Sequence, residues 1–374
     1  MSPERSPASL FDKRVVTVCG AGGVGKTTTS AAFALAAARA GRRVLVLTID
    51  PSKRLAQTLG VSPDAPEPTV LAVDRQREAG IRGPGSLSAW MLDPQAVSDQ
   101  TVRRLAPDTA SAERLMHNRI YRNVTSMIAG MQEYMAVEAL HEFVREDRYD
   151  LIVLDTPPSR DALRFLEAPS RATAFLEPRI LKLFVPGSTN RIRRAATRLF
   201  ERLLDLALGQ KARREIQQFF ENFERVLLYL SRNQGEMHDF FGGDHVAFLL
   251  VSSPRPEALE EAFYFEEKTR LLSLPLAGYV LNRSRAWRRD LPLPSDPKLL
   301  PGASRAARRG LAKLLPFAES EARSAENHAA LLSALAERSP GSFALALPDL
   351  PEGASDLASL GALADVLGDS SPGS

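Results

Sequence analysis

Cysteine is almost missing from this sequence, which contains Cys19 alone among 374 residues. An intramolecular disulfide is therefore excluded, and so is a zinc site built from paired cysteines within one chain. The histidines lie at no spacing typical of metal ligands, so we expect no zinc; they are His117, His141, His238, His245 and His328. A chain with so little cysteine is most simply interpreted as cytoplasmic.

Long apolar runs are missing too. No stretch of ~18 apolar residues occurs, so we expect no membrane-spanning helix. Residues 1–10 lack the apolar core of a secretory signal, so we expect no such signal.

Neither sign of charge dominates, and a net charge of +3 gives no reason to expect nucleic acid as a partner. The hydrophobic fraction of 44% and the charged fraction of 25% are typical of a folded globular protein.

The length allows two or three domains, or one large α/β domain with insertions. We expect a disordered lead-in over residues 1–13, a single domain over residues 14–369 and a frayed tail over residues 370–374. No internal repeat is visible in the sequence.

Short apolar segments alternate with helical patterns along much of the chain. The apolar residues 14–19 precede a helix-forming segment at 30–39 and a second apolar segment at 43–48. A strand, a helix and a strand within ~35 residues form a βαβ unit, which implies a parallel sheet. Further strands are expected at 69–73, 87–92, 151–154, 246–252, 277–281 and 343–347. This alternation predicts an α/β fold with a doubly wound, mostly parallel sheet.

Two segments interrupt the alternation. Residues 95–147 and 170–240 contain helical patterns and no expected strand. We interpret both as helical insertions that form a subdomain. Apolar residues recur at helical spacing over 219–230, a stripe that packs as ordinary core in most proteins. Another helix is expected at 316–338.

A glycine-rich loop lies between the first expected strand and the first expected helix. Residues 20–27, GAGGVGKT, match the pattern G-x4-G-K-[ST]. Glycines allow backbone N–H groups to turn towards a phosphate chain, and the following helix adds its positive N-terminus. We expect Lys26 to reach the β- and γ-phosphates of ATP and the Thr27 hydroxyl to ligate Mg²⁺. The candidate ATP contacts in this loop are Gly22, Gly23, Val24, Gly25, Lys26, Thr27 and Thr28.

Two of the expected strands end in a carboxylate. Asp155 ends the apolar segment YDLIVLD, the pattern of an aspartate that holds Mg²⁺ at the carboxyl end of a strand. Asp50 follows the segment at 43–48, where its carboxylate would orient an attacking water molecule or cap the next helix. Spacing alone favours neither role for Asp50.

Four segments together carry a resemblance to a known family. They are AGGVGKTTTSAAFALAAA, VLVLTIDPSKRLAQTLG, YDLIVLDTPPSRDALRFLEAP and AGYVLNR, in this order between residues 21 and 283. Residues 155–166 resemble the pattern D-T-A-P-T-G-H-T-L-R-F-L, the second switch of the ATPases that drive arsenite pumps and guide tail-anchored membrane proteins. The resemblance implies a deviant Walker P-loop NTPase fold, Mg²⁺-dependent hydrolysis of ATP and a dimer.

The same resemblance implies roles for single residues. Asp50 falls on the water-activating aspartate of the first switch, so that Lys26 and Asp50 become the candidate catalytic residues. Asn282 falls on the asparagine that reads the adenine edge, and Pro348 falls where the family wraps adenine. The candidate Mg²⁺ ligands remain Thr27 and Asp155.

The sequence also departs from the family. Where the family's loop has a lysine that crosses to the partner's nucleotide, this chain has Ala21, which cannot donate a charge. Three alternatives follow: the chain hydrolyses ATP slowly, Arg160 in the second switch replaces that cation, or the chain pairs with a paralogous ATPase that bears the lysine. The cysteines of the family's arsenite and zinc sites are absent, so neither ligand is expected.

The predicted function is a nucleotide switch that couples ATP hydrolysis to a hydrophobic client protein or a membrane-associated partner. In the targeting branch such a client lies in a groove, for which residues 170–240 are the candidates. The alternative is a partitioning-type positioning ATPase that binds membrane or DNA. Its membrane versions end in a basic amphipathic helix, whereas residues 349–374 contain five acidic residues and no lysine or arginine. A metabolic kinase or ligase is disfavoured by the match to the second switch.

Overall fold

The structure is a computed structural model. It describes residues 6–49, 54–118, 121, 131–156, 219, 229, 239–288, 302, 304–339, 341–350, 353–354 and 356–369. The chain divides into two compact units, of which the second takes in residues 92–146 and 161–242. The sequence-predicted insertions fall almost entirely within these two ranges. The remaining residues form the first unit, and each unit is described by itself.

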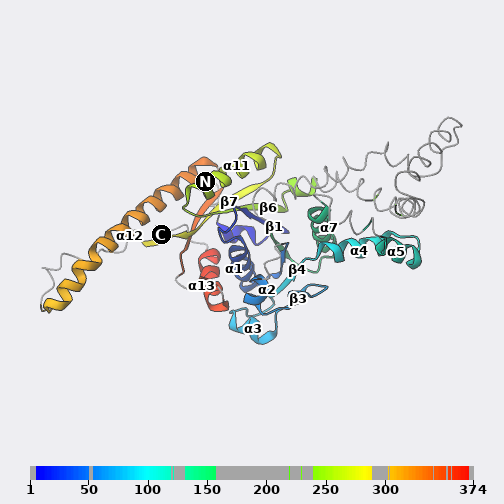
Figure 1. The fold of residues 1–374 in the computed structure, drawn as a ribbon, viewed down its shortest axis with the longest axis horizontal. Helices are drawn as coiled ribbons and strands as arrows, with labels where there is room; N and C mark the ends of the chain where they lie inside the picture. Colours follow the sequence, from blue (N-terminus) through cyan, green and yellow to red (C-terminus); the bar gives the residue numbers. More distant parts are fainter. Residues whose placement is uncertain are drawn as a thin grey trace, which may run out of the picture. The chain divides into compact units, whose positions relative to one another are not determined.

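An eight-stranded sheet in the described residues forms the centre of the first unit (Figure 1). The strands are Val15–Gly20 (β1), Arg43–Thr48 (β2), Thr69–Val70 (β3), Ser86–Met91 (β4), Leu151–Asp155 (β5), Val246–Ser252 (β6), Leu276–Ser284 (β7) and Phe343–Pro348 (β8). Their order across the sheet is β3-β4-β2-β5-β1-β6-β7-β8. The short β3 is antiparallel to β4, and the other pairs are parallel. The predicted doubly wound, mostly parallel α/β sheet is thereby confirmed.

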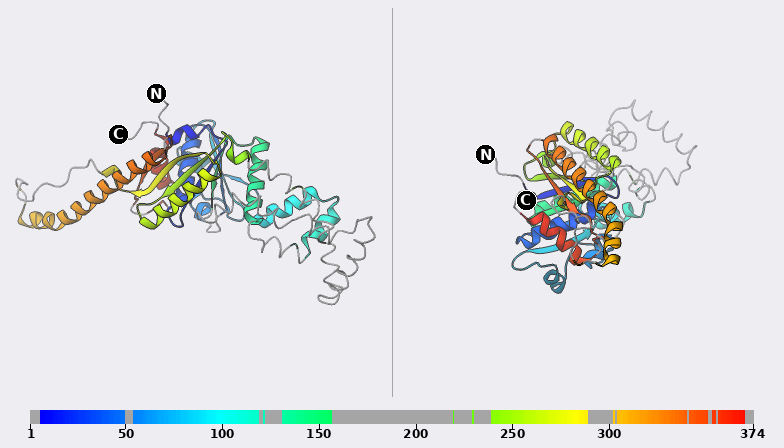
Figure 2. Two further views of the ribbon diagram at one scale, coloured as in Figure 1. Left: turned by 90° about the horizontal axis from the view of Figure 1, so that it is seen from above. Right: turned by 90° about the vertical axis from the view of Figure 1, so that its left-hand side faces the viewer.

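Helices cover both faces of this sheet (Figure 2). They are Pro7–Leu10 (η1), Lys26–Arg39 (α1), Arg54–Leu59 (α2), Val73–Glu78 (α3), Pro256–Leu271 (α11), Ala286–Arg288 (η2), Arg305–Arg338 (α12) and Leu357–Gly368 (α13). From β1 the chain moves across the sheet in one direction to β2, and from β6 in the other direction to β7 and β8. Right-handed crossovers therefore put α1 on one face and α11 and α12 on the opposite face.

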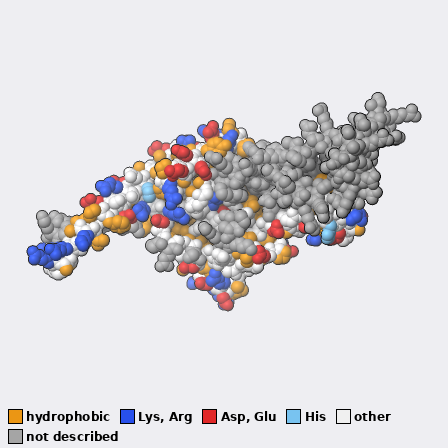
Figure 3. Space-filling model, in the orientation of Figure 1, with side chains coloured by type: hydrophobic (Ala, Val, Ile, Leu, Met, Phe, Trp, Pro, Cys, Tyr) orange, Lys and Arg blue, Asp and Glu red, His pale blue; other side chains and the backbone are white. Residues whose placement is uncertain are grey.

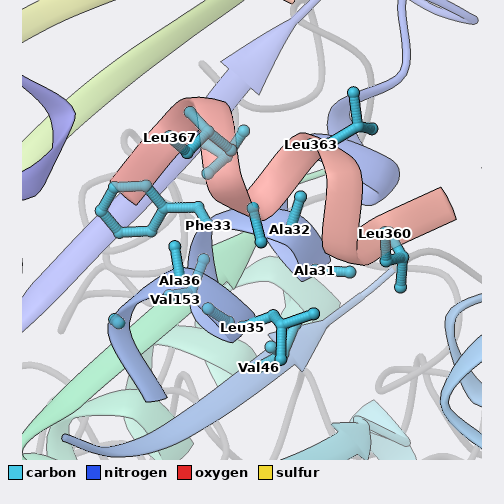
Figure 4. Packing of buried hydrophobic residues seen from close by; sticks show 14 of the residues in the cluster. Ala31, Ala32, Phe33, Leu35, Ala36, Val46, Val153, Leu360, Leu363 and Leu367 are labelled. Atoms are coloured by element: carbon cyan, nitrogen blue, oxygen red, sulfur yellow. The ribbon is translucent and has the colours of Figure 1, made fainter. Parts of the chain in front are cut away.

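The core of the first unit lies between the sheet, α1 and α13. Strands β1, β5 and β6 are buried along their whole length, as expected for strands with helices on both sides. Small side chains on α1, Ala31 and Ala32 among them, let Leu360 and Leu363 of α13 pack closely against that helix (Figure 4). This packing fixes the start of α1, and with it the loop that joins β1 to α1.

Near the ends of the first unit, the structure corrects one expectation from the sequence and adds a helix that the sequence analysis did not predict. Residues 1–13 were expected to be a disordered lead-in, but Pro7–Leu10 form a 3-10 helix and Leu10 is buried in the core. The ring of Phe11 lies edge-on to Phe33 of α1 with centroids 5.3 Å apart, so apolar burial orders this segment. The helix α13 was not expected at all. The predicted tail at residues 370–374 lies outside the described residues.

Two further elements have bounds that differ from those expected from the sequence. The strand expected at 69–73 ends at Val70, and α3 begins at Val73. The helix expected to start at Pro316 starts at Arg305 instead, with Ser304 as its N-cap. The Ser304 hydroxyl accepts a hydrogen bond from the N–H of Ala307 at 3.1 Å, and the helix continues through the proline.

The described part of the second unit is helical. Its longer helices are Pro94–Leu105 (α4), Thr109–Met116 (α5) and Met131–Glu146 (α7). Arg104 of α4 forms ion pairs with Glu138 at 2.9 Å and Glu142 at 2.8 Å on α7. Most of the apolar stripe predicted at 219–230 lies outside the described residues. Among the helices that are described, none combines the length and apolar character needed to cross a membrane.

Candidate functional site

The glycine-rich loop joins the end of β1 at Gly20 to the start of α1 at Lys26. Gly23 has a φ of 75° and Gly25 a φ of 95°, in the left-handed region that favours glycine. A Cβ atom on Gly25 would lie 2.1 Å from the side-chain nitrogen of Asn282, so the loop has no room for a larger residue there. The sequence motif thus forms a tight loop directly before the N-terminus of a helix, a position at which an anion is stabilised.

Lys26 turns its side chain back over this loop. Its Nζ donates a hydrogen bond to the carbonyl oxygen of Ala21 at 2.9 Å, and the residue is 8% exposed. The amine is thereby held at the loop, at the position from which it would reach a bound phosphate chain.

Asp155 lies at the end of β5, between the ends of β1 and β2, and is fully buried. Its Oδ2 accepts hydrogen bonds from the Thr27 hydroxyl at 2.7 Å and the Thr48 hydroxyl at 2.9 Å. The Ser30 hydroxyl lies 3.4 Å from its Oδ1. A carboxylate beside a threonine hydroxyl is a set of hard oxygen donors, which suits Mg²⁺. The structure therefore brings together both sequence-predicted metal ligands.

Ser30 and Thr48 were missed by the sequence analysis. Ser30 lies three residues after Thr27 on the same face of α1, a spacing that could have suggested a shared partner. Thr48 is the register partner of Asp155 across β2 and β5, which becomes visible only when the strand order is known. Both hydroxyls orient the carboxylate.

Replacing Thr48 by valine is expected to raise the Mg²⁺ concentration needed for half-maximal ATP hydrolysis by ~10-fold, the lower range for loss of a group that orients a metal ligand. Valine keeps the shape of threonine and removes the hydroxyl donor. Thr17→Val is the matched control, because Thr17 is a buried β1 residue whose hydroxyl has no hydrogen-bond partner in the described structure. An equal Mg²⁺ dependence of Thr48→Val and Thr17→Val would contradict the orienting role.

Asn282 lies beside the phosphate loop. Its side-chain nitrogen donates a hydrogen bond to the carbonyl oxygen of Val24 at 2.8 Å. The next residue, Arg283, has a φ of 56°, and the register of β7 with β8 shifts between Leu281 and Ser284. This irregular strand end aims Asn282 at the loop. Pro348, the other candidate adenine contact, ends β8 in register with Ser284.

Some of the candidate site residues lie outside the described residues, and others are placed in α1 or in the core. Asp50 and Arg160 lie outside the described residues, as do residues 157–166 of the second switch. Thr28 lies in the first turn of α1, and Ala21 is 5% exposed with its side chain in the core.

The single cysteine has no metal-binding or nucleophilic character. Burial raises the pKa of the Cys19 thiol to about 12, so it stays protonated at neutral pH. Within the described part of the chain, no group of three or more His, Cys, Asp or Glu side chains is placed to hold a metal ion.

A parallel sheet with a GKT loop between β1 and α1, and a buried aspartate at the end of the adjacent strand, defines a P-loop NTPase fold. The family model of the anion-transporting ATPases matches residues 13–261. The chain belongs to this family, and the resemblance noted in its sequence motifs is confirmed.

Individual relatives agree with this assignment. A protein of Aquifex aeolicus that is named, provisionally, as arsenical pump-driving ATPase 1 is 25% identical over 256 residues, 67% of this chain and 58% of that protein. ATPase GET3 of Kluyveromyces lactis is 29% identical over 176 residues, 44% of this chain and 47% of that protein. ATPase ASNA1 homolog 1 of Paramecium tetraurelia is 31% identical over 163 residues, 41% of this chain and 43% of that protein. The chain thus spans about half the length of these curated relatives.

Proposed function

We propose that this chain binds ATP together with Mg²⁺ at the loop between β1 and α1 and hydrolyses the bond between the β- and γ-phosphates. The observation that carries the proposal is the 2.7 Å hydrogen bond between the Thr27 hydroxyl and the Asp155 carboxylate, next to Lys26 at the start of α1. These are the cation and the oxygen ligands that phosphoryl transfer to water needs. The names of the relatives, an arsenical pump-driving ATPase and GET3 among them, support the same chemistry.

In this proposal the residues divide the work by their chemistry. Lys26 supplies positive charge to the β- and γ-phosphates, while the first turn of α1 and the loop glycines supply backbone N–H donors. Thr27 and Asp155 would hold Mg²⁺, which neutralises charge on the phosphate oxygens when it is bound. Asn282, held on the Val24 carbonyl, borders the loop from the β7 side, where we propose that it contacts adenine.

Asp50 is proposed to orient and deprotonate the attacking water. Asp50 follows Thr48 by two residues in the sequence, and the Thr48 hydroxyl donates a hydrogen bond to Asp155, the proposed metal ligand. Asp50→Asn is expected to keep the ATP affinity within a few fold and to lower turnover by ~10²-fold or more, as for a lost general base. Calorimetric titration with ATP and a phosphate-release assay measure the two quantities. Undiminished turnover in Asp50→Asn would contradict the role in orienting water and favour the role of Asp50 as the cap of the next helix.

We further propose that this ATPase is a nucleotide switch that acts on a hydrophobic client protein or a membrane-associated partner and works as a dimer. The second switch begins at Asp155 and Thr156, and the Thr156 hydroxyl donates to the carbonyl oxygen of Val18 at 2.8 Å on β1. The proposed switch thus starts at Asp155, the proposed metal ligand, and continues in the sequence into residues 161–242, which belong to the second unit. Order in such a segment is typically set by the γ-phosphate.

Limited proteolysis tests this coupling. In Asp50→Asn, which should hold ATP without turnover, ATP with Mg²⁺ is expected to change the cleavage rate within residues 157–242 several fold relative to ADP. The same comparison in Lys26→Ala should show no difference, because the γ-phosphate is no longer held. Identical cleavage with ATP and ADP in Asp50→Asn, at saturating nucleotide, would contradict the switch and leave the ATPase proposal standing.

A further inference from the structure

Among the described residues, the ion pairs and side-chain hydrogen bonds that join the long helix α12 to the rest of the first unit come from its second half. Arg285 forms an ion pair with Glu321 at 2.5 Å, and its backbone N–H donates to Nδ1 of His328 at 3.0 Å. Near the end of the helix, Arg338 pairs with the buried Glu266 of α11. Figures 1 and 2 show the first half of α12 extending away from these contacts. The helix is therefore anchored from Glu321 onward.

The side of α12 that packs on the protein continues into the first half, where part of it is exposed. Ala325 and Leu335 are buried, whereas Leu314 is 60% exposed and Phe317 is 66% exposed. Leu314 precedes Ala325 by eleven residues, about three helical turns, so the two side chains lie on the same side of the helix. Residues 311–318, LAKLLPFA, thus present an apolar side on which Leu314 and Phe317 are exposed, while Leu311, Leu315 and Ala318 are half-buried.

The opposite side of this first half is basic. Arg305, Arg308, Arg309 and Lys313 are all exposed, and residues 304–318 contain no acidic side chain. At about 100° per residue, Arg305, Arg308 and Arg309 fall on the side of the helix away from Leu314, and Lys313 lies at the border of the apolar side, next to Phe317. Figure 3 shows Lys and Arg side chains gathered at this end of the helix. We call residues 305–318 the basic amphipathic segment.

We propose that the basic amphipathic segment docks on an anionic phospholipid surface, with Leu314 and Phe317 entering the headgroup region. Helices with Lys and Arg on one side and Leu and Phe on the other bind at this depth, and negative headgroups complement the four cations. A second copy of the chain fits less well. Packed through their apolar sides, two such segments would leave all their cations without a negative partner, because residues 304–318 contain no acidic side chain, and the apolar side of the second half of α12 is already covered at Ala325 and Leu335.

Vesicle flotation of the intact chain tests the proposal. The wild type is expected to float with vesicles of phosphatidylcholine containing 30% phosphatidylglycerol, and not with phosphatidylcholine alone. The double change Leu314→Ser with Phe317→Ser should lower the bound fraction at least ~10-fold, because it removes most of the inserted apolar surface. Arg308→Gln with Arg309→Gln should weaken binding by ~25-fold, since one basic residue near an anionic surface contributes about a fivefold gain in affinity.

The matched control is Val70→Ser with Val73→Ser, which changes two apolar residues that are 56% and 62% exposed elsewhere on the first unit. This control should float as the wild type does. Equal binding to both kinds of vesicle, no flotation, or unchanged flotation of both α12 variants would overturn the proposal. So would a wild-type dimer, seen by sedimentation velocity without vesicles, that Leu314→Ser with Phe317→Ser dissociates. ATP titration of every variant shows separately whether the nucleotide site is intact.

Discussion

Replacing Lys26 by alanine is expected to lower ATP turnover by at least ~10²-fold, the scale of losing one charged or hydrogen-bonding group at the reacting phosphate. ATP affinity should fall as well, because the phosphate chain loses its main side-chain counter-ion. The expectation follows from the position of Lys26, whose amine is held by the Ala21 carbonyl at the loop that joins β1 to α1. Cys19, which lies in β1 just before this loop, cannot replace the charge of the lysine, because burial raises the pKa of its thiol to about 12 and keeps it neutral.

Two measurements check this expectation: calorimetric titration with ATP and Mg²⁺ for affinity, and phosphate release at saturating ATP for turnover. Lys268→Ala is the control, since it removes a lysine from α11, where Lys268 lies 5.7 Å from the ring of Tyr264. The control should bind and hydrolyse ATP as the wild type does. Intact affinity and turnover in Lys26→Ala would place the nucleotide elsewhere.

The second large effect concerns the partner. Adding a paralogous ATPase that keeps the family's loop lysine is expected to raise the ATP turnover of this chain by up to ~10³-fold, as a cation donated to the transferred phosphoryl group does. This chain has Ala21 at that position, and its side chain is buried in the core. A symmetric homodimer would therefore offer no lysine to either nucleotide, whereas a heterodimer would complete the site that contains this chain's ATP.

The comparison needs three arms: this chain alone, with the paralogue, and with a paralogue whose loop lysine is changed to alanine. Turnover should rise in the second arm only. Arg160→Ala in the isolated chain tests the other proposed source of a cation, because Arg160 lies in the segment that resembles the family's second switch. Rapid turnover of the isolated chain that survives Arg160→Ala would refute both the pairing and the local substitute.

The phosphate loop was predictable because its structure is local. The residues GAGGVGKT form a turn whose backbone conformation needs glycine at certain positions. Gly23 and Gly25 adopt the positive φ values that this turn requires. The apolar strand that ends in Asp155 is similarly local. Its hydrogen bond to Thr27 could be expected from the motif alone, since both residues were assigned to the same ion.

The rest of the site depends on strand order, which the sequence does not display. Thr48 meets Asp155 because β5 lies between β1 and β2, and Asn282 meets Val24 because an irregular end of β7 turns towards the loop. At the fold level, Pro316 suggested a helix start, but an N-cap at Ser304 begins the helix earlier. The helix α13 was missed in the sequence analysis, and its buried leucines pack against α1 and the rest of the core of the first unit.

The central claim is that ATP with Mg²⁺ binds at the loop between β1 and α1, with Thr27 and Asp155 holding the metal ion. Calorimetric titration of the intact chain with ATP, once with Mg²⁺ and once with excess EDTA, tests it most directly. We expect saturable binding at one site per chain with Mg²⁺ and at least ~10-fold weaker binding without it, since charge neutralisation at the phosphates is lost. Absence of binding with Mg²⁺, or an affinity that EDTA leaves unchanged, would contradict the assignment.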